Sequence, residues 1–428
     1  MAQFESGKIL KTSSGDPVTI MKLLGSGGQG DVYMVDYKGE KKALKWYRDV
    51  GKNPDAFYSN LKHNVEKGSP DKAFLWPQAI MEKAEGSFGY IMDLRPDGYY
   101  EISEFMLANV TFASFKVAVD SCLKIVSAFR ILHNIGYSYQ DMNDGNFFIN
   151  PTTGDVLICD NDNVSPNGAN TGIIGKPRYI APEIVCNGAL PNTQTDRFSL
   201  SVILFIILFM NHPFEGKKSL VPCLTPPIAE RIYGSEALFL YDPQDKSNAP
   251  VKNIHTNVVA RWKFMPNYIK ETFLKAFSQQ AIKEPGRRLR ELDWLKVLVR
   301  FRSDIMKCRC GNEVFINNAA TTACDSCKKP MVINHTIQLP EYAITAAKGS
   351  RIYRCQLGVC NADDALNPVM MVVAKDNAPD VLGLKNMTAQ ILTAVTTTGN
   401  IRQVAPKEVV PFKAGIVIEA YGEKIKLK

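Results

Sequence analysis

Two aspartates and an asparagine have the types and spacing that metal-dependent chemistry on phosphates requires. Asp141 lies in the run YQDMNDGN, Asn146 follows five residues later, and Asp160 ends the run VLICD a further 14 residues on. A carboxylate such as that of Asp141 can accept a hydroxyl proton, and the oxygens of Asn146 and Asp160 are ligands that Mg²⁺ prefers. Asp162 competes as the metal ligand, and we favour Asp160 because it directly follows the apolar run 156–159. The simpler alternative is a polar turn between a helix and a strand.

A glycine-rich segment near the N-terminus could cover phosphate groups. It matches the pattern G-x-G-x-x-G-x-V, with Gly25, Ser26, Gly27, Gly28, Gln29, Gly30 and Val32 in the corresponding places. Glycines let the backbone approach phosphate oxygens closely. Residues 31–35 alternate like a strand, so the loop joins two strands, as in a lid over ATP, and does not open a helix as in a dinucleotide fold. An ordinary glycine-rich hairpin is the alternative.

A lysine on the next expected strand could hold the nucleotide. Lys45 follows Ala43 and Leu44 and lies 15 residues beyond Gly30. From that strand its ammonium group could reach the α and β phosphates. Taken alone, the residue is better explained as an ordinary exposed strand lysine.

These motifs, with the run GKPRYIAPE at 175–183, resemble in order and spacing the eukaryotic-like (Hanks-type) Ser/Thr protein kinases over about residues 19–302. The resemblance implies a two-lobed α+β fold that uses ATP and Mg²⁺ and phosphorylates protein substrates. It also implies particular roles: the gatekeeper for Met92, the adenine hinge for Asp93 and Leu94, a hold on the catalytic-loop backbone for Asp196, and a Glu183–Arg288 ion pair.

The sequence also departs from this family. Tyr139 and Gln140 replace the usual His-Arg, Asn143 replaces a lysine, and Asn161-Asp162 replace Phe-Gly. Both Glu66 and Asn64 are candidates for the helix residue that pairs with Lys45. A nucleotide-binding pseudokinase scaffold without phosphoryl transfer is therefore the alternative to an active kinase.

Four cysteines form two close pairs that predict a metal site. Cys308 and Cys310 are separated by one residue, Cys324 and Cys327 by two, and 13 residues lie between the pairs. Four thiolates on two turns can surround a structural Zn²⁺ tetrahedrally, as in a zinc ribbon. Unpaired or redox-active cysteines are the alternative.

The 428 residues predict two or three domains. We expect a kinase domain at 1–303 (small lobe 1–95, large lobe 96–303), a zinc ribbon at 304–334 and a small all-β domain at 335–428. The last domain loosely resembles forkhead-associated sandwiches. The whole arrangement is similar to the kinases of bacterial phosphorylation triads linked to tellurite resistance, which implies a phosphatase and a von Willebrand A-type protein as partners.

Several elements must position these residues. The patterns predict three strands within 19–47, a helix at 54–67, a strand at 89–94, a helix at 111–136, strands at 146–149 and 156–159, and then mainly helices to 302. The apolar run 198–210 is too short for a membrane helix and predicts a buried one. No signal-peptide pattern opens the sequence, so we expect a cytoplasmic protein. The net charge of +8 is mild, and we expect no nucleic-acid or membrane partner.

Overall fold

The computed structural model describes residues 4–51, 53–84, 86–169, 172, 174–316 and 321–428. The chain divides into two compact units, each assembled from three segments. Unit 1 comprises residues 1–112, 131–255 and 276–288, and unit 2 comprises residues 113–130, 256–275 and 289–428. The predicted division at residue 303 stays a prediction; unit 2 combines segments from both sides of that residue.

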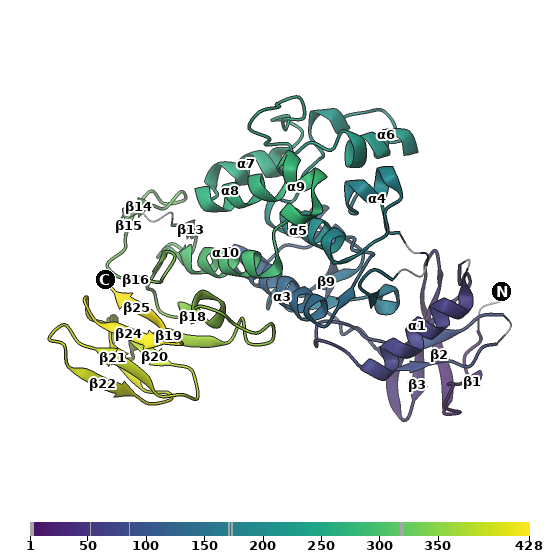
Figure 1. Ribbon diagram of the computed structural model, residues 1–428, viewed down its shortest axis with the longest axis horizontal. Coiled ribbons are helices and arrows are strands. Elements are labelled where there is room, and N and C mark those ends of the chain that lie inside the picture. The colour runs from purple at the N-terminus through teal and green to yellow at the C-terminus, as the bar shows by residue number, and fades with distance from the viewer. Residues whose placement is uncertain (1–3, 52, 85, 170–171, 173, 317–320) are drawn as a thin grey trace. The chain divides into compact units, whose positions relative to one another are not determined.

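Unit 1 begins with a twisted antiparallel sheet of six strands in the order β1-β2-β3-β4-β6-β5. The strands are β1 (Ile9–Lys11), β2 (Pro17–Ser26), β3 (Gly30–Tyr37), β4 (Glu40–Tyr47), β5 (Ala79–Ile80) and β6 (Gly89–Asp93). Helix α1 (Pro54–Lys67) begins where Asn53 accepts a hydrogen bond from the Ala56 amide, and it buries Phe57 and Leu61 among residues of β4 and β6. Both this helix and the sheet can be followed in Figure 1.

The remainder of unit 1 is helical with short strand pairs. Its strands are β7 (Tyr100–Glu101), β8 (Tyr137–Ser138), β9 (Phe147–Ile149), β10 (Val156–Ile158) and β11 (Ser165–Pro166), and its helices are α2 (Ile102–Met106), α4 (Pro182–Asn187), α5 (Thr193–Phe209), α6 (Pro226–Glu230) and α9 (Gln279–Lys283). Nearly every side chain of α5 is buried, which explains the apolar run as a core helix. No helix in the described ranges is long and apolar enough to cross a membrane.

Unit 2 combines helices with a β-rich C-terminal part. Helix α3 (Phe115–Asn134) lies in this unit up to residue 130, with α7 (Thr256–Phe264), α8 (Asn267–Ala276) and α10 (Glu291–Asp304). Two hairpins follow, β12 (Ile305–Lys307) with β13 (Glu313–Phe315) and β14 (Thr321–Ala323) with β15 (Pro330–Val332).

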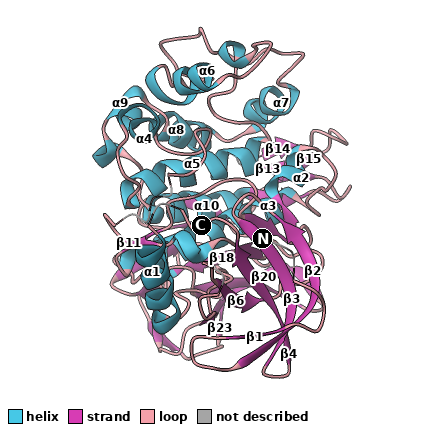
Figure 2. Ribbon diagram, turned by 90° about the vertical axis from the view of Figure 1, so that its right-hand side faces the viewer, coloured by secondary structure: helices cyan, strands magenta, loops and turns pink. Residues whose placement is uncertain are grey.

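The C-terminal part is all-β, as the pattern predicts. One sheet has the order β17-β16-β25-β24-β21-β22 and the other β18-β19-β20-β23, and one apolar core draws residues from both. The strands are β16 (Thr336–Gln338), β17 (Ala343–Thr345), β18 (Arg351–Tyr353), β19 (Pro368–Lys375), β20 (Ala378–Asn386), β21 (Leu392–Val395), β22 (Ile401–Val404), β23 (Val409–Pro411), β24 (Val417–Ala420) and β25 (Glu423–Leu427). Figure 2 shows the strands in magenta and the helices in cyan. Whether the sheets form a forkhead-associated-like sandwich stays a prediction.

Candidate active site

Strand β4 carries Lys45 at a point where neighbouring backbones come very close. A Cβ atom at Gly30 would lie 2.1 Å from the Trp46 carbonyl oxygen, and one at Gly89 would lie 2.4 Å from the Lys45 carbonyl oxygen. Only glycine fits these positions, so β3 and β6 can pack tightly on either side of β4. The two glycines thereby fix the strand that presents Lys45.

The glycine-rich loop joins β2 to β3, as the sequence predicts. The Gly27 amide donates to the Gly30 carbonyl over 2.8 Å, and the Arg48 amide donates to the Gln29 carbonyl over 2.8 Å. The Arg48 guanidinium also donates to the Gly27 carbonyl. Residues 25–29 are exposed, so the loop is tied at its base and open to solvent along its length.

Lys45 forms ion pairs with two aspartates from the segment after β10. Its Nζ lies 3.1 Å from Asp160 Oδ1 and 2.9 Å from Asp162 Oδ2. Burial opposes the charge of Lys45, but the carboxylates of Asp162 and Asp160 outweigh it and raise the pKa of Lys45. Asp162 is fully buried and also accepts from the Tyr47 hydroxyl, whereas the Asp160 side chain is 38% exposed. Of the two, Asp160 is the carboxylate that a ligand can approach.

Helix α1 does not supply the partner of Lys45. Asn64 is buried and donates to the Val164 carbonyl over 2.8 Å, and Asn60 donates to the same oxygen over 2.9 Å. Glu66 is exposed. Within the described ranges, the carboxylates within 4.0 Å of the lysine are those of the two aspartates. Sequence spacing alone missed this use of Asp162.

Asp141 lies in a loop that its neighbours hold in place. Asn146 Nδ2 donates to the Asp141 carbonyl over 2.8 Å, and Asn143 Nδ2 donates to Asp141 Oδ1 over 3.2 Å. Burial, followed by the Asp160 carboxylate, raises the pKa of Asp141 to about 6. A carboxyl with that pKa is ionised at neutral pH and is a stronger base than an ordinary aspartate.

Helix α5 also holds the backbone of this loop through hydrogen bonds to Asp196. Asp196 accepts from the Tyr139 amide over 2.6 Å and from the Gln140 amide over 3.1 Å, and its Oδ2 lies 2.9 Å from His133 Nε2. This is the contact to the loop backbone that the family resemblance implies. The expected pair of Glu183 and Arg288 is also present, with two hydrogen bonds of 2.7 and 2.8 Å.

An apolar cluster contains Met92 and Leu94, two of the three residues that the resemblance places around adenine. Ala43 pairs with Met92 across β4 and β6, and both are buried in one cluster, against which Val32 and Leu94 pack. Leu157 of β10 packs there too and was not among the predicted site residues. In the apolar run VLIC the sequence pattern does not distinguish Leu157 from its neighbours, so it carries no signal for this role. Asp93 lies at the exposed end of β6, where Lys42 Nζ donates to it over 2.8 Å.

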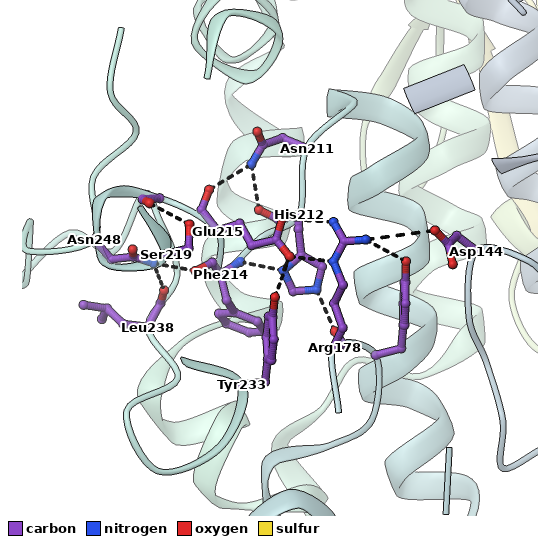
Figure 3. A network of polar contacts seen from close by, with 12 residues as sticks. Asp144, Arg178, Asn211, His212, Phe214, Glu215, Ser219, Tyr233, Leu238 and Asn248 are labelled. Atoms are coloured by element: carbon purple, nitrogen blue, oxygen red, sulfur yellow. Dashed lines mark hydrogen bonds and ion pairs between the residues drawn. The ribbon is translucent and has the colours of Figure 1, made fainter. Parts of the chain in front are cut away.

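A second polar network joins the segment before α4 to residues that follow α5 (Figure 3). Arg178 donates to Glu215 through Nε over 2.5 Å and Nη2 over 2.9 Å, and the Tyr233 hydroxyl donates to the same carboxylate over 2.7 Å. His212 Nδ1 accepts from the Phe214 amide over 3.2 Å, so its Nε2 donates to the Arg178 carbonyl over 2.7 Å. The network fixes the segment between the catalytic loop and α4.

In unit 2 the four predicted cysteines come together. Their Sγ atoms all lie within 4.8 Å of one another, with Cys308 to Cys327 at 3.7 Å and Cys310 to Cys324 at 3.6 Å. Four thiolates about 2.3 Å from a tetrahedral Zn²⁺ would be about 3.8 Å apart. The cluster therefore fits zinc by donor type and by spacing.

Comparisons with known proteins bear on part of this chain. Residues 81–249 match the protein kinase domain family, a range that begins after Lys45 and the glycine-rich loop. Serine/threonine-protein kinase Sgk1-B of Xenopus laevis is 23% identical over 209 residues, covering 46% of this chain and 46% of that protein. Serine/threonine-protein kinase plk-2 of Caenorhabditis elegans is 33% identical over 101 residues, covering 22% of this chain and 15% of that protein.

A solved structure is also similar. It is a mutant kinase domain of PknI from Mycobacterium tuberculosis, at 15% identity and a TM-score of 0.47, covering 69% of this chain and 98% of that one. The chain spans less than half the length of the two curated relatives named above. The chain matches the protein kinase domain family over residues 81–249 and is similar to curated Ser/Thr protein kinases.

Proposed function

We propose that the protein is an ATP- and Mg²⁺-dependent protein kinase that phosphorylates Ser or Thr hydroxyls of protein substrates. The observation that carries the proposal is the convergence in unit 1 of Lys45, Asp141, Asn146 and Asp160. These residues come from β4, from the loop before β9 and from the end of β10, and they match the parts that phosphoryl transfer needs.

Each residue has a distinct role in this proposal. Asp141 accepts the proton of the attacking hydroxyl, and its position is held by Asn143 and Asn146. Lys45 holds the nucleotide phosphates from β4. Asn146 and Asp160 would hold Mg²⁺, which when bound neutralises charge on the phosphates. The apolar cluster around Ala43 and Met92 would take the adenine ring.

The test is single-turnover transfer from γ-labelled ATP to a generic protein substrate or to the protein itself. Wild type should transfer label to Ser or Thr at least 100-fold faster than Asp141→Ala, as expected for loss of a general base. Asp97→Ala, which changes an exposed aspartate, is the matched control and should equal wild type. Binding of Mg-ATP without any transfer above Asp141→Ala would refute the proposal and select the pseudokinase alternative.

We further propose that the cysteine cluster holds one structural zinc ion, and that the β-rich C-terminal part recruits substrate or partner proteins. Four thiolates leave no open coordination position, so the metal is structural rather than catalytic. By resemblance to triad kinases, the partners would be a phosphatase and a von Willebrand A-type protein. Elemental analysis should give one zinc per chain, and Cys310→Ser should lower that ratio well below one.

A further inference from the structure

Transfer of a phosphoryl group needs positive charge near the three oxygens that carry charge in the transition state. Lys45 supplies one ammonium group, but that group already lies within 3.1 Å of both Asp160 and Asp162. Part of its charge is therefore balanced before any nucleotide binds. A second cation, close to Asp141 and less engaged, would act where the hydroxyl attacks.

Lys176 is such a cation. It lies in the segment before α4, and its Nζ donates to Asn143 Oδ1 over 3.1 Å, while Asn143 Nδ2 donates to Asp141 Oδ1 over 3.2 Å. One amide group therefore separates the lysine from the carboxylate of Asp141. The Lys176 side chain also acts electrostatically on Asp141, since its charge opposes the rise in the pKa of that carboxyl.

The backbone keeps Lys176 in this place. Gly175 has a φ of +87°, and a Cβ atom there would lie 3.2 Å from the Gln140 carbonyl oxygen and 3.4 Å from Asp141 Oδ1. The segment therefore passes directly over the catalytic loop, in a conformation that favours glycine. The Lys176 side chain follows directly after this close approach and contacts Asn143 of the same loop.

The engagement of Lys176 differs from that of Lys45. Lys176 is exposed, and in the described part of the chain its ammonium group has the neutral amide of Asn143 as partner and no carboxylate within 4.0 Å. A solvent-facing ammonium group beside Asp141, held by a neutral acceptor, is free to exchange that acceptor for a phosphate oxygen.

We propose that Lys176 is a catalytic residue whose ammonium group binds the phosphoryl group during transfer, with Asn143 as its positioning residue. The inference rests on the proposed kinase function. In the reaction the hydroxyl oxygen forms a bond to the γ-phosphorus as the bond from that phosphorus to the bridging oxygen breaks. The hydroxyl proton passes to Asp141, and the electron pair of the broken bond leaves with ADP. Lys176 neutralises charge and exchanges no proton.

The test separates transfer from nucleotide binding. Lys176→Met should lower the single-turnover rate constant about 100-fold or more, the size of effect seen when one preorganised donor is removed. The dissociation constant of Mg-ATP should change less than threefold, because the contact forms with the phosphoryl group in transit. Lys176→Arg should retain most of the rate. Lys283→Met, an exposed lysine on α9, is the control and should match wild type.

A relocated lysine makes the test sharper. The double variant Lys176→Asn with Asn143→Lys exchanges the two residues, so that position 143 now carries the ammonium group. Its single-turnover rate should be at least tenfold higher than that of Lys176→Asn alone. Equal rates for Lys176→Met and Lys283→Met would overturn the inference, as would a rise in the dissociation constant equal to the fall in rate. If wild type is no faster than Asp141→Ala, the kinase proposal itself fails.

Discussion

Lys45 and Asp162 form a buried ion pair, with Nζ and Oδ2 2.9 Å apart and both side chains at most 7% exposed. The Tyr47 hydroxyl donates to the same carboxylate. Within the described residues, the carboxylates that pair with Lys45 therefore come from the segment after β10 and not from α1. Helix α1 contacts this segment two residues further on, where Asn60 and Asn64 donate to the Val164 carbonyl.

Asp162→Asn tests this relationship. The change leaves Lys45 in a buried site with one carboxylate instead of two, which should cost about 3 kcal/mol of unfolding free energy. We expect Tm to fall by roughly 5–10 °C and the single-turnover rate to fall with it. Glu66→Gln, on the exposed face of α1, should change neither quantity. If differential scanning fluorimetry shows a lower Tm for Glu66→Gln and an unchanged Tm for Asp162→Asn, the carboxylate that holds Lys45 lies on helix α1 instead.

The fall of kcat/KM at low pH should report the protonation of Asp141. Its pKa is raised to about 6, chiefly by burial and then by Asp160, and only the ionised carboxylate accepts the hydroxyl proton. The value of kcat/KM should therefore rise with pH up to about 6 and level off above it, since this ratio reports groups of the free enzyme. Below pH 6 it should fall about tenfold per unit. A rate that is flat from pH 5 to 8 would exclude Asp141 as the base.

How far the sequence could predict this site depended on distance along the chain. Helix α1 has the predicted bounds, and Asp141 lies five residues from Asn146, so contiguous patterns were sufficient there. Lys45 and Asp162 are separated by 117 residues. Asp160 adopts a left-handed φ of 51°, and its side chain is 38% exposed while that of Asp162 is buried. Periodicity carries no information about such a turn, because an aspartate tolerates it only when tertiary contacts hold it there.

Gly30 should tolerate substitution far less than its neighbour Gly28. A Cβ atom at Gly30 would overlap the Trp46 carbonyl, whereas one at Gly28 meets nothing within 4 Å. Gly30→Ala should therefore force β3 away from β4, at a cost of about 1–3 kcal/mol, and reduce stabilisation by Mg-ATP. Gly28→Ala should fold and melt like wild type. Equal melting temperatures of the two variants would contradict the close approach of the strands.

His212 should make the protein sensitive to acid. It is fully buried, and burial lowers its pKa to about 4 from an ordinary 6.5. Between these values the unfolded chain binds more protons than the folded one, so stability is lost as pH falls from 6.5 to 4, by up to about 3 kcal/mol. His212→Gln, which cannot be protonated, should lose less Tm than wild type over this interval. If the Tm of the two proteins falls equally between pH 6.5 and 4, the His212 ring does not gain a proton when the protein unfolds.

The hairpin that carries Cys308 and Cys310 contacts the start of helix α3, in part through one carboxylate. Glu313 lies in β13, on the hairpin that carries Cys308 and Cys310, and it accepts from the Phe115 amide over 2.5 Å and the Lys116 amide over 3.3 Å at the start of α3. The Phe115 and Phe315 rings pack 4.9 Å apart beside this contact. Loss of the proposed zinc should loosen the hairpin and with it this helix terminus.

Hydrogen exchange can follow that loosening directly. After chelation of zinc, or in Cys310→Ser, amides in peptides spanning residues 113–120 should exchange faster, because the free N–H groups at a helix start lose their carboxylate acceptor. Glu313→Gln should raise exchange in the same peptides while the zinc content stays at one. Cys223→Ser, which changes an exposed cysteine outside the cluster, should leave both unchanged. Unaltered exchange in the zinc-free protein would show that the hairpin holds the helix without its metal.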